Sequence, residues 1–293
     1  MAKLEGAFTA LITPFKDSGA IDEQGLRRNV NFQIERGIGG LVPCGTTGES
    51  ATLTHAEHKR VVEIVIDEVN GRVPVIAGTG SNSTAEAIDL TKHAFEAGAD
   101  YCLLISPYYN KPTQKGVIAH FRAVAAESEG GLILYNVPSR TSLNLEADTV
   151  IKLAEVDNIV GVKEASGNLE QIMRIIRDAG QKLTVLSGDD IMTYPILALG
   201  GKGVISVASN IVPDMVQKMV DDFLKGRVEE SRQAHYRLLD VYKHLFLETN
   251  PGPIKEMMNL AGMPAGPLRL PLVSCDEKNV EILRRDLKDL GLT

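Results

Sequence analysis

The chain contains no tryptophan, and only three of its 293 residues are cysteines: Cys44, Cys102 and Cys275. These lie far apart in the sequence and form no Cys-x-x-Cys pair, so a disulfide framework is not indicated. Cys44 and Cys102 stand in apolar runs, where a free cysteine acts as a small buried hydrophobic residue. The odd number of cysteines predicts a reducing compartment, the cytoplasm.

Long apolar runs and an excess of basic residues are also missing. No run approaches the roughly 20 apolar residues that span a bilayer, and Met1–Gly6 lacks the apolar part of a cleavable signal peptide. The formal net charge of −7 argues against a nucleic-acid partner. We therefore expect a cytoplasmic protein that binds neither membranes nor nucleic acids. Anionic substrates remain allowed, because a pocket needs only one well-placed arginine or lysine.

Short apolar runs alternate with longer helical patterns over most of the chain. Several of these runs are apolar at consecutive positions, which is typical of parallel strands covered on both faces. Eight strand–helix units fit residues 1–225 and predict an α/β fold, a (β/α)8 TIM barrel. The predicted strands are Phe8–Ile12, Gly40–Cys44, Val73–Ala77, Tyr101–Ile105, Leu132–Tyr135, Ile159–Lys163, Thr184–Ser187 and Val204–Val207.

Helix start signals support these units. Thr54–Glu57 and Ser83–Glu86 both have the spacing of a capping box. Asp189 or Asp190 can cap a later helix, and Pro213 suits the first turn of another.

A doubly wound open sheet is the alternative architecture. It would normally carry a Gly-x-Gly-x-x-Gly turn after its first strand. The segment Thr13–Asp17, which follows the first predicted strand, contains no glycine. The pattern therefore favours the barrel.

From residue 226 to residue 293 the pattern changes. Arg227–Leu247 and Glu277–Leu290 are predicted as amphipathic helices, and a proline- and glycine-rich stretch, Asn250–Pro271, joins them. No strand is indicated there. We expect a C-terminal helical appendage that packs on the barrel and is not an independent domain.

Active sites of such barrels lie at the carboxyl ends of the strands. The residues just after the predicted strands are polar but nearly uncharged, with Lys163 at their centre. No His, Asp or Glu ends a strand in a way that would form a metal site. His55 and His58 stand one turn apart, but the sequence His-Ala-Glu-His matches neither of the zinc-binding motifs His-Glu-x-x-His and His-x-x-Glu-His. We expect no metal and no other cofactor.

Lys163 ends the apolar run Ile159–Val162. Burial can lower the pKa of an ammonium group from about 10.4 by several units. The free amine can then attack a ketone and form an imine. Considered alone, Lys163 is better interpreted as a solvated lysine at a strand end, but its neighbours favour the reactive interpretation.

Three neighbouring features fit a keto-acid substrate. Tyr135 ends the preceding predicted strand, so its phenol should lie beside Lys163, either as a proton shuttle or as an amphipathic residue at the edge of the core. Arg140 can bind a carboxylate with two parallel hydrogen bonds, although a loop arginine is by default solvated. The run Gly45–Ser50 can hold a carboxylate with hydroxyls and main-chain amides, or can be a plain turn.

Five segments of the chain, in this order, become distinctive when they are taken together: Gly45–Ser50, Pro107–Pro112, Leu134–Thr141, Gly161–Gly167 and Leu186–Asp190. Each motif alone is modest, but the set spans nearly the whole chain. Together they closely resemble the family of 4-hydroxy-tetrahydrodipicolinate synthases, also called dihydrodipicolinate synthases. This family belongs to the Schiff-base-forming pyruvate lyase and aldolase superfamily.

The resemblance implies condensation of pyruvate with L-aspartate 4-semialdehyde in diaminopimelate and lysine biosynthesis. It implies that Lys163 forms the imine with pyruvate, and that a hydrogen-bonded proton relay consists of Tyr135, Thr46 and Tyr109. Tyr109 would reach into the site of a neighbouring subunit. The family is typically a homotetramer built from tight dimers, which fits a tyrosine shared across an interface.

The resemblance also implies which groups bind the two substrates. Thr47 and the main chain of Gly188 and Ile205 would help to hold the part derived from pyruvate. Arg140 would bind the carboxylate of the semialdehyde and support Tyr135.

Lysine-sensitive members of the family bind L-lysine at a dimer interface. All seven residue types of that set recur here: Ser50, Ala51, His55, His58, Asn82, Glu86 and Tyr108. Glu86 also has an explanation as a capping residue, and His58 as a residue of a helix surface. The resemblance implies feedback inhibition by L-lysine.

Two alternatives remain. Related 2-keto acid aldolases, such as N-acetylneuraminate lyase and keto-deoxy sugar-acid aldolases, share the lysine and the tyrosine. They generally lack an arginine at the place of Arg140 and differ in the loop after the second strand. A catalytically silent barrel that only binds a small effector would tolerate loss of Lys163, whereas this chain retains Lys163, Tyr135, Thr46 and Tyr109 together.

Overall fold

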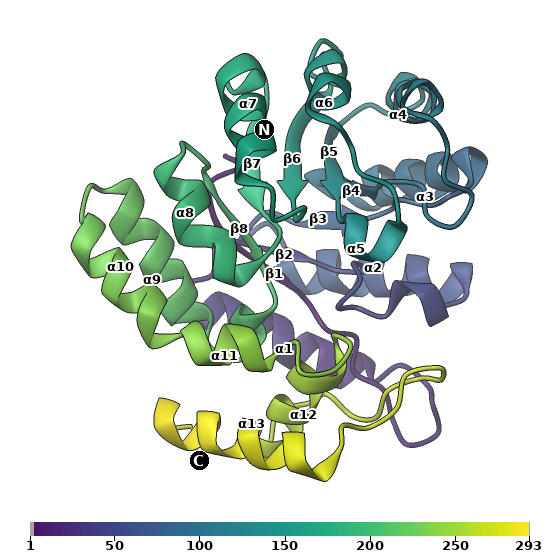
Figure 1. Ribbon diagram of the computed structural model, residues 1–293. Helices are drawn as coiled ribbons and strands as arrows, with labels where there is room; N and C mark the ends of the chain where they lie inside the picture. Colours follow the sequence, from purple (N-terminus) through teal and green to yellow (C-terminus); the bar gives the residue numbers. More distant parts are fainter. Residues whose placement is uncertain (1–2, 293) are drawn as a thin grey trace.

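The computed structural model describes residues 3–292, so the first and last residues of the two regions expected from the sequence, Met1 and Thr293, lie outside the described residues. Eight parallel strands form a barrel surrounded by helices (Figure 1). Around it the strands follow the order β2-β1-β8-β7-β6-β5-β4-β3. A parallel bridge between Leu41 and Val75 joins the two ends of this order. The predicted (β/α)8 barrel is confirmed.

The strands are close to those predicted from the sequence, and two of them, β4 and β7, have the predicted limits. Their bounds are Gly6–Ala10 (β1), Gly40–Val42 (β2), Ile76–Gly78 (β3), Tyr101–Ile105 (β4), Gly131–Asn136 (β5), Ile159–Glu164 (β6), Thr184–Ser187 (β7) and Gly203–Ser206 (β8).

The other six predicted strands have limits that differ from the observed ones, and four of these differences have a physical reason. β2 ends at Val42 because Cys44 has a left-handed backbone with φ 55°. β3 begins at Ile76 because Pro74 has no amide hydrogen for a ladder. β1 and β8 begin at glycines that the prediction left out, and a Cβ on Gly203 would lie 1.9 Å from the Gly6 carbonyl oxygen. Only glycine permits this approach of the two backbones.

Eight helices form the outer layer, one for each strand, and a short extra helix, α5 (Pro138–Thr141), precedes α6. The eight are α1 (Glu23–Glu35), α2 (His55–Val69), α3 (Thr84–Ala97), α4 (Gln114–Ala126), α6 (Ala147–Leu153), α7 (Leu169–Ala179), α8 (Thr193–Ala198) and α9 (Pro213–Leu224). Short 3-10 helices precede α2, α8 and α9: Ser50–Thr52 (η1), Asp190–Met192 (η2) and Ala208–Asn210 (η3).

The two predicted capping boxes differ. At the start of α2, Thr54 accepts from the Glu57 amide while the Glu57 side chain accepts from the Thr54 amide, so this box is complete. At the start of α3, Ser83 accepts from the Glu86 amide at 3.5 Å, but the Glu86 side chain turns away to other partners. The second capping box is therefore only half formed, and the Glu86 carboxylate contacts His55 and Ser81 instead.

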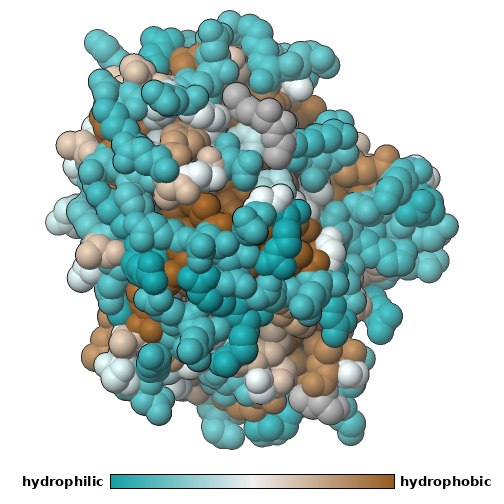
Figure 2. Space-filling model, turned by 180° about the vertical axis from the view of Figure 1, so that it is seen from behind, coloured by the Kyte–Doolittle hydropathy of each residue, from teal (hydrophilic) through white to brown (hydrophobic). Residues whose placement is uncertain are grey.

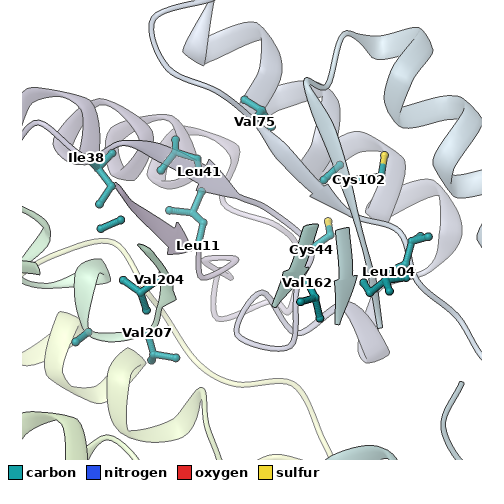
Figure 3. Packing of buried hydrophobic residues seen from close by; sticks show 14 of the residues in the cluster. Leu11, Ile38, Leu41, Cys44, Val75, Cys102, Leu104, Val162, Val204 and Val207 are labelled. Atoms are coloured by element: carbon teal, nitrogen blue, oxygen red, sulfur yellow. The ribbon is translucent and has the colours of Figure 1, made fainter. Parts of the chain in front are cut away.

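Alternation along the strands divides the core into two layers. Inside the barrel, every second strand residue packs in one cluster that includes Phe8, Ile133 and Ile205. The residues between them point outward and pack against the helices. Figure 3 shows part of this outer layer, in which Cys44 and Cys102 lie among aliphatic side chains. Both are free and buried, as predicted, and burial raises the pKa of the Cys102 thiol to about 12.

The C-terminal region consists of four helices: α10 (Val228–Arg237), α11 (Leu239–His244), α12 (Gly252–Leu260) and α13 (Glu277–Leu290). The predicted single helix Arg227–Leu247 is interrupted at Leu238, and α12 was not predicted. Pro251, the N-cap residue, and Pro253, in the first turn, hid this helix, although proline is tolerated at a helix start. α11 contacts η2, and α12 contacts η3, so this region packs on loops that follow β7 and β8 (Figure 1).

The face opposite to that of Figure 1 is mostly hydrophilic, with a smaller hydrophobic area near its centre (Figure 2). Within residues 3–292, no helix has the length and apolar character required to cross a membrane.

Candidate active site

A cavity of about 600 Å³ opens at the carboxyl ends of the strands. Strands or loops after β2, β5, β6, β7 and β8 form its walls, and residues just after α11 complete it. The lining residues are Thr46, Thr47, Tyr135, Val137, Ser139, Arg140, Lys163, Ala165, Gly188, Asp189, Val207, Phe246, Leu247, Glu248, Thr249 and Asn250.

Lys163 is the only lysine that lines this cavity. β5 and β6 pair so that Tyr135 lies directly opposite Lys163. The Lys163 Nζ atom lies 4.1 Å from the centroid of the Tyr135 ring, and the residue is only 6% exposed. Among residues 3–292, no side chain or carbonyl forms a hydrogen bond or ion pair with this Nζ. The predicted contact between the two residues is confirmed, and the amine faces the cavity without a bound counterion.

Gly188 lies against the shaft of Lys163. A Cβ at this position would meet the Ala165 Cβ at 2.8 Å, the Lys163 Cγ at 3.0 Å and the Lys163 Cε at 3.1 Å. The adjacent Asp189 also lines the cavity, where burial raises the pKa of its carboxyl group and the positive charge of Lys163 lowers it. A side chain on Gly188 would therefore press on Ala165 and on the aliphatic part of Lys163.

Thr46 and Thr47 belong to the tight turn between β2 and η1. Main-chain hydrogen bonds fix this turn, from the Gly48 amide to the Gly45 carbonyl and from the Glu49 amide to the Thr46 carbonyl, both at 3.1 Å. The Thr47 hydroxyl oxygen accepts from Asn250 Nδ2 at 3.0 Å. Within the described chain, the hydroxyls of Thr46 and Tyr135 have no hydrogen-bond partner. The two line one cavity, but no direct hydrogen bond links them as a relay.

Arg140 lies in α5 and lines the cavity, and its Nη2 donates to the Asn250 carbonyl oxygen at 3.3 Å.

Tyr109 does not line this cavity: it is 89% exposed and has a left-handed φ of 69°. The Ile205 side chain points into the barrel, and Val207 lines the cavity instead.

A second cavity, of about 440 Å³, adjoins the first. Five residues line both of them: Thr46, Tyr135, Arg140, Thr249 and Asn250. Six of the seven residues predicted for L-lysine binding line the second cavity: Ser50, Ala51, His55, His58, Glu86 and Tyr108. Asn82 does not line it, and its carbonyl oxygen accepts from Asn110 at 2.9 Å.

Glu86 is held by two polar neighbours at the second cavity. Its carboxylate pairs with His55 Nε2 at 2.5 Å and accepts a short hydrogen bond from the Ser81 hydroxyl. His58 is buried, which lowers its pKa, and its Nε2 lies 2.8 Å from the Gly78 carbonyl oxygen. The interpretations of Glu86 as a simple capping residue and of His58 as a surface residue were therefore wrong.

Sequence reasoning missed the residues that the C-terminal region contributes. Asn250 contacts both Thr47 and Arg140, and Lys255 forms a buried ion pair with Glu49 at 2.8 Å. No role was assigned to Glu49 itself from the sequence. No group of three or more His, Cys, Asp or Glu in the described part of the chain is placed to hold a metal ion.

The chain is similar to known proteins over nearly its whole length. A model of the dihydrodipicolinate synthetase family matches residues 3–290. The 4-hydroxy-tetrahydrodipicolinate synthase of Methanothrix thermoacetophila is 55% identical over 280 residues, covering 95% of this chain and 94% of that protein. The enzyme of the same name from Methanocaldococcus jannaschii is 55% identical over 289 residues, covering 98% of this chain and 99% of that protein.

Solved structures agree in fold. A chloride-inhibited dihydrodipicolinate synthase from Acinetobacter baumannii in complex with pyruvate has a TM-score of 0.97 and 40% identity, covering 99% of this chain and 100% of that one. The enzyme from Cyanidioschyzon merolae with lysine bound has a TM-score of 0.96 and 44% identity, covering 99% of both chains. A monomeric dihydrodipicolinate synthase variant has a TM-score of 0.96 and 41% identity, covering 99% of this chain and 97% of that one.

Proposed function

The chain belongs to the dihydrodipicolinate synthetase family, and we propose that it condenses pyruvate with L-aspartate 4-semialdehyde through an imine on Lys163. The activity is that of a 4-hydroxy-tetrahydrodipicolinate synthase, a carbon–carbon lyase in diaminopimelate and lysine biosynthesis. One observation carries the proposed mechanism: the Lys163 Nζ faces the cavity at 4.1 Å from the centroid of the Tyr135 ring and forms no ion pair within residues 3–292.

The first half of the reaction forms the imine. The lone pair of Lys163 Nζ attacks C2 of pyruvate, and the carbonyl oxygen becomes a hydroxyl group. The Tyr135 hydroxyl donates a proton to that group, which leaves as water, and a protonated imine remains. Loss of a proton from C3 gives an enamine, because the positive imine nitrogen accepts the electron pair.

The second half forms the carbon–carbon bond. The enamine C3 attacks the aldehyde carbon of the semialdehyde, whose oxygen gains a proton, and the imine is restored. Attack of the substrate's own amine on the imine carbon then closes a ring and releases Lys163. No step requires an oxidant or a metal, since the imine nitrogen holds the electrons that move.

Other groups of the site bind and orient the substrates. We assign Thr47 and the main chain of Gly188 and Ile205 to the part derived from pyruvate. Arg140 binds the carboxylate of the semialdehyde, a role supported by its place on the wall shared by the two cavities.

A proton relay of Tyr135, Thr46 and Tyr109 completes the site when a second subunit supplies Tyr109. We propose a homotetramer built from two tight dimers. The exposure of Tyr109 supports an interface there. One structural neighbour is a monomeric variant, so light scattering of the purified protein is the appropriate test.

Two experiments test the chemistry. Pyruvate with L-aspartate 4-semialdehyde should be consumed, while pyruvate with N-acetylmannosamine, the aldehyde partner of the alternative lyase, should not. Turnover of Lys163→Ala should be at least about a thousandfold below the natural enzyme, since the covalent step is lost. Normal turnover by Lys163→Ala would refute the imine mechanism.

We further propose that L-lysine binds in the second cavity, with its ammonium group at Glu86, and inhibits the enzyme in the cytoplasm. A neighbour with bound lysine and the agreement of residue types support this assignment. Calorimetry should detect L-lysine binding that Glu86→Ala weakens strongly. Absence of binding at millimolar L-lysine would remove this part of the proposal.

A further inference from the structure

Asn250 joins the two predicted carboxylate-binding residues, Thr47 and Arg140. Its side-chain Nδ2 donates to the Thr47 hydroxyl oxygen at 3.0 Å, and its main-chain carbonyl oxygen accepts from Arg140 Nη2 at 3.3 Å. Asn250 lies on the wall shared by the two cavities and is only 4% exposed. Its own Oδ1 is buried without a hydrogen-bond partner in the described chain.

The direction of the hydrogen bond between Asn250 and Thr47 determines whether the Thr47 hydroxyl can donate a hydrogen bond to the substrate. An amide NH2 group only donates, so the Thr47 oxygen must accept. The single hydroxyl hydrogen of Thr47 is then left for another acceptor. Thr47 is 2% exposed, and its hydroxyl makes no second hydrogen bond within residues 3–292, while the residue lines the catalytic cavity.

A carboxylate is the acceptor that suits this hydrogen. An ionised carboxylate has no hydrogen to donate, so it binds well to a hydroxyl only when that hydroxyl donates. A freely rotating threonine would present either its hydrogen or its lone pairs to the substrate. The Asn250 amide occupies one of the two lone pairs, so the hydroxyl hydrogen of Thr47 is directed away from Asn250 and is free for the substrate.

We propose that Asn250 is a positioning residue that fixes the Thr47 hydroxyl as a hydrogen-bond donor to the carboxylate of pyruvate. This inference rests on the proposed role of Thr47 in pyruvate binding. The C-terminal region thereby contributes to selection of a 2-keto acid over a carbonyl compound without a carboxylate. The same residue holds Arg140 through its main chain, so side-chain substitutions leave that contact in place.

Asn250→Asp is the sharpest test because it keeps the shape and reverses the hydrogen bonding. A carboxylate at position 250 only accepts, so it draws the Thr47 hydrogen to itself and turns the hydroxyl lone pairs toward the substrate. We expect the KM for pyruvate to rise by about tenfold or more, the effect of losing one charge-assisted hydrogen bond, with a smaller change in kcat. Asn250→Ala frees the hydroxyl to rotate and should raise the KM less.

A double-mutant cycle isolates the pair. In the full-length enzyme, KM and kcat for pyruvate are measured for Asn250→Ala, for Thr47→Val and for the double variant. Asn250→Ala should raise the KM in the natural background but by less than about twofold beside Thr47→Val, where no hydroxyl remains to orient. Circular dichroism and borohydride trapping at saturating pyruvate check that each variant is folded with a reactive lysine.

The outcomes distinguish the proposed binding role of Thr47 from the proposed positioning role of Asn250. If Thr47→Val leaves the KM for pyruvate unchanged, the proposed binding role of Thr47 fails, and this inference fails with it. If Thr47→Val raises the KM but Asn250→Asp leaves it within about twofold, the binding role stands and the inference is overturned. Equal effects of Asn250→Ala in both backgrounds overturn it as well. If Asn250→Asp does not fold, the double-mutant cycle alone decides.

Discussion

The position of the Lys163 amine depends on close packing around its aliphatic shaft. Gly188 provides that packing because it has no side chain, and a Cβ there would meet the Lys163 Cε at 3.1 Å. Gly188→Ala should therefore move the amine and lower the rate of imine formation by about tenfold or more, whereas overpacking of this kind costs only about 1–3 kcal/mol of stability. Stopped-flow trapping of pyruvate measures the first effect, and urea unfolding measures the second. An unchanged trapping rate would show that the contact is not needed.

Asp190 carries a charge that is expensive to bury. Its Oδ2 accepts from the amides of Val207 and Ala208 at 2.9 and 3.0 Å, yet burial raises its pKa from 3.8 to about 6. In the unfolded chain the carboxyl group ionises near pH 4, while in the folded protein it ionises near pH 6. The folded state therefore binds more protons between these values, and the free energy of unfolding falls as the pH rises through this range.

An asparagine side chain cannot ionise, so the variant Asp190→Asn should lack this loss of stability. The difference in unfolding free energy between the variant and the natural protein should grow in favour of the variant from pH 4 to pH 6. It should then level off, with a total change on the order of 3 kcal/mol. Urea unfolding at several pH values measures it. A difference that is flat across this range would contradict the account.

Side-chain neighbours within the parallel barrel could be predicted from the sequence, but contacts from the C-terminal region could not. Tyr135 and Lys163 end adjacent strands, so strand order alone brings them together. Asn250 contacts Thr47 across 203 positions of the chain, and no local pattern encodes that contact. Glu86 had the spacing of a capping residue, but its carboxylate lies closer to His55 and Ser81.

At the scale of elements, a buried ion pair connects α12 to the turn that carries Thr46 and Thr47. Lys255 Nζ donates to Glu49 Oε1 at 2.8 Å and to the carbonyl oxygens of Thr13 and Pro267. It also lies 4.5 Å from the Phe15 ring centroid. Glu49 has a left-handed φ of 53° and also accepts from the Arg269 amide at 3.0 Å. These contacts hold the turn against the C-terminal region.

Removal of one member of this buried ion pair should destabilise the fold far more than removal of one member of an exposed ion pair. Lys255→Met leaves the Glu49 carboxylate buried and unpaired, which should destabilise the fold by about 3–5 kcal/mol. Lys182→Met is the matched control, because Lys182 and Glu155 are more than half exposed, and it should cost less than about 1 kcal/mol. Similar urea midpoints for the two variants would show that the buried pair does not hold the turn.

Element boundaries could be predicted where periodicity and caps agreed, as for β4, β7 and the start of α2. They were missed where a single backbone angle determines the end of a strand, as at Cys44. The break at Leu238 between α10 and α11 has no glycine or proline beside it, so the sequence carried no signal for it.

The C-terminal helices share a buried hydrophobic cluster with the helices of the barrel. Tyr242, Leu245, Ile254 and Met257 belong to the same buried cluster as residues of the barrel helices. Phe246–Asn250 also form one wall of the catalytic cavity. The division at residue 226 is therefore a change of pattern in the sequence and not a boundary in the packing.

A chain cut to residues 1–225 should accordingly fail to fold to a compact state, because it exposes the barrel surface that α11 and α12 cover. Circular dichroism with thermal unfolding should show no cooperative transition, and pyruvate should not be trapped. A soluble fragment that unfolds cooperatively would show that the barrel is independent of the C-terminal region.

The most direct test of the whole account is borohydride reduction in the presence of pyruvate, followed by mass mapping of the modified peptide. We predict that reduced pyruvate is attached to Lys163 alone and that the modification disappears in Lys163→Ala. Attachment to another side chain, or undiminished labelling of the variant, would contradict the central claim that this one buried amine captures the substrate.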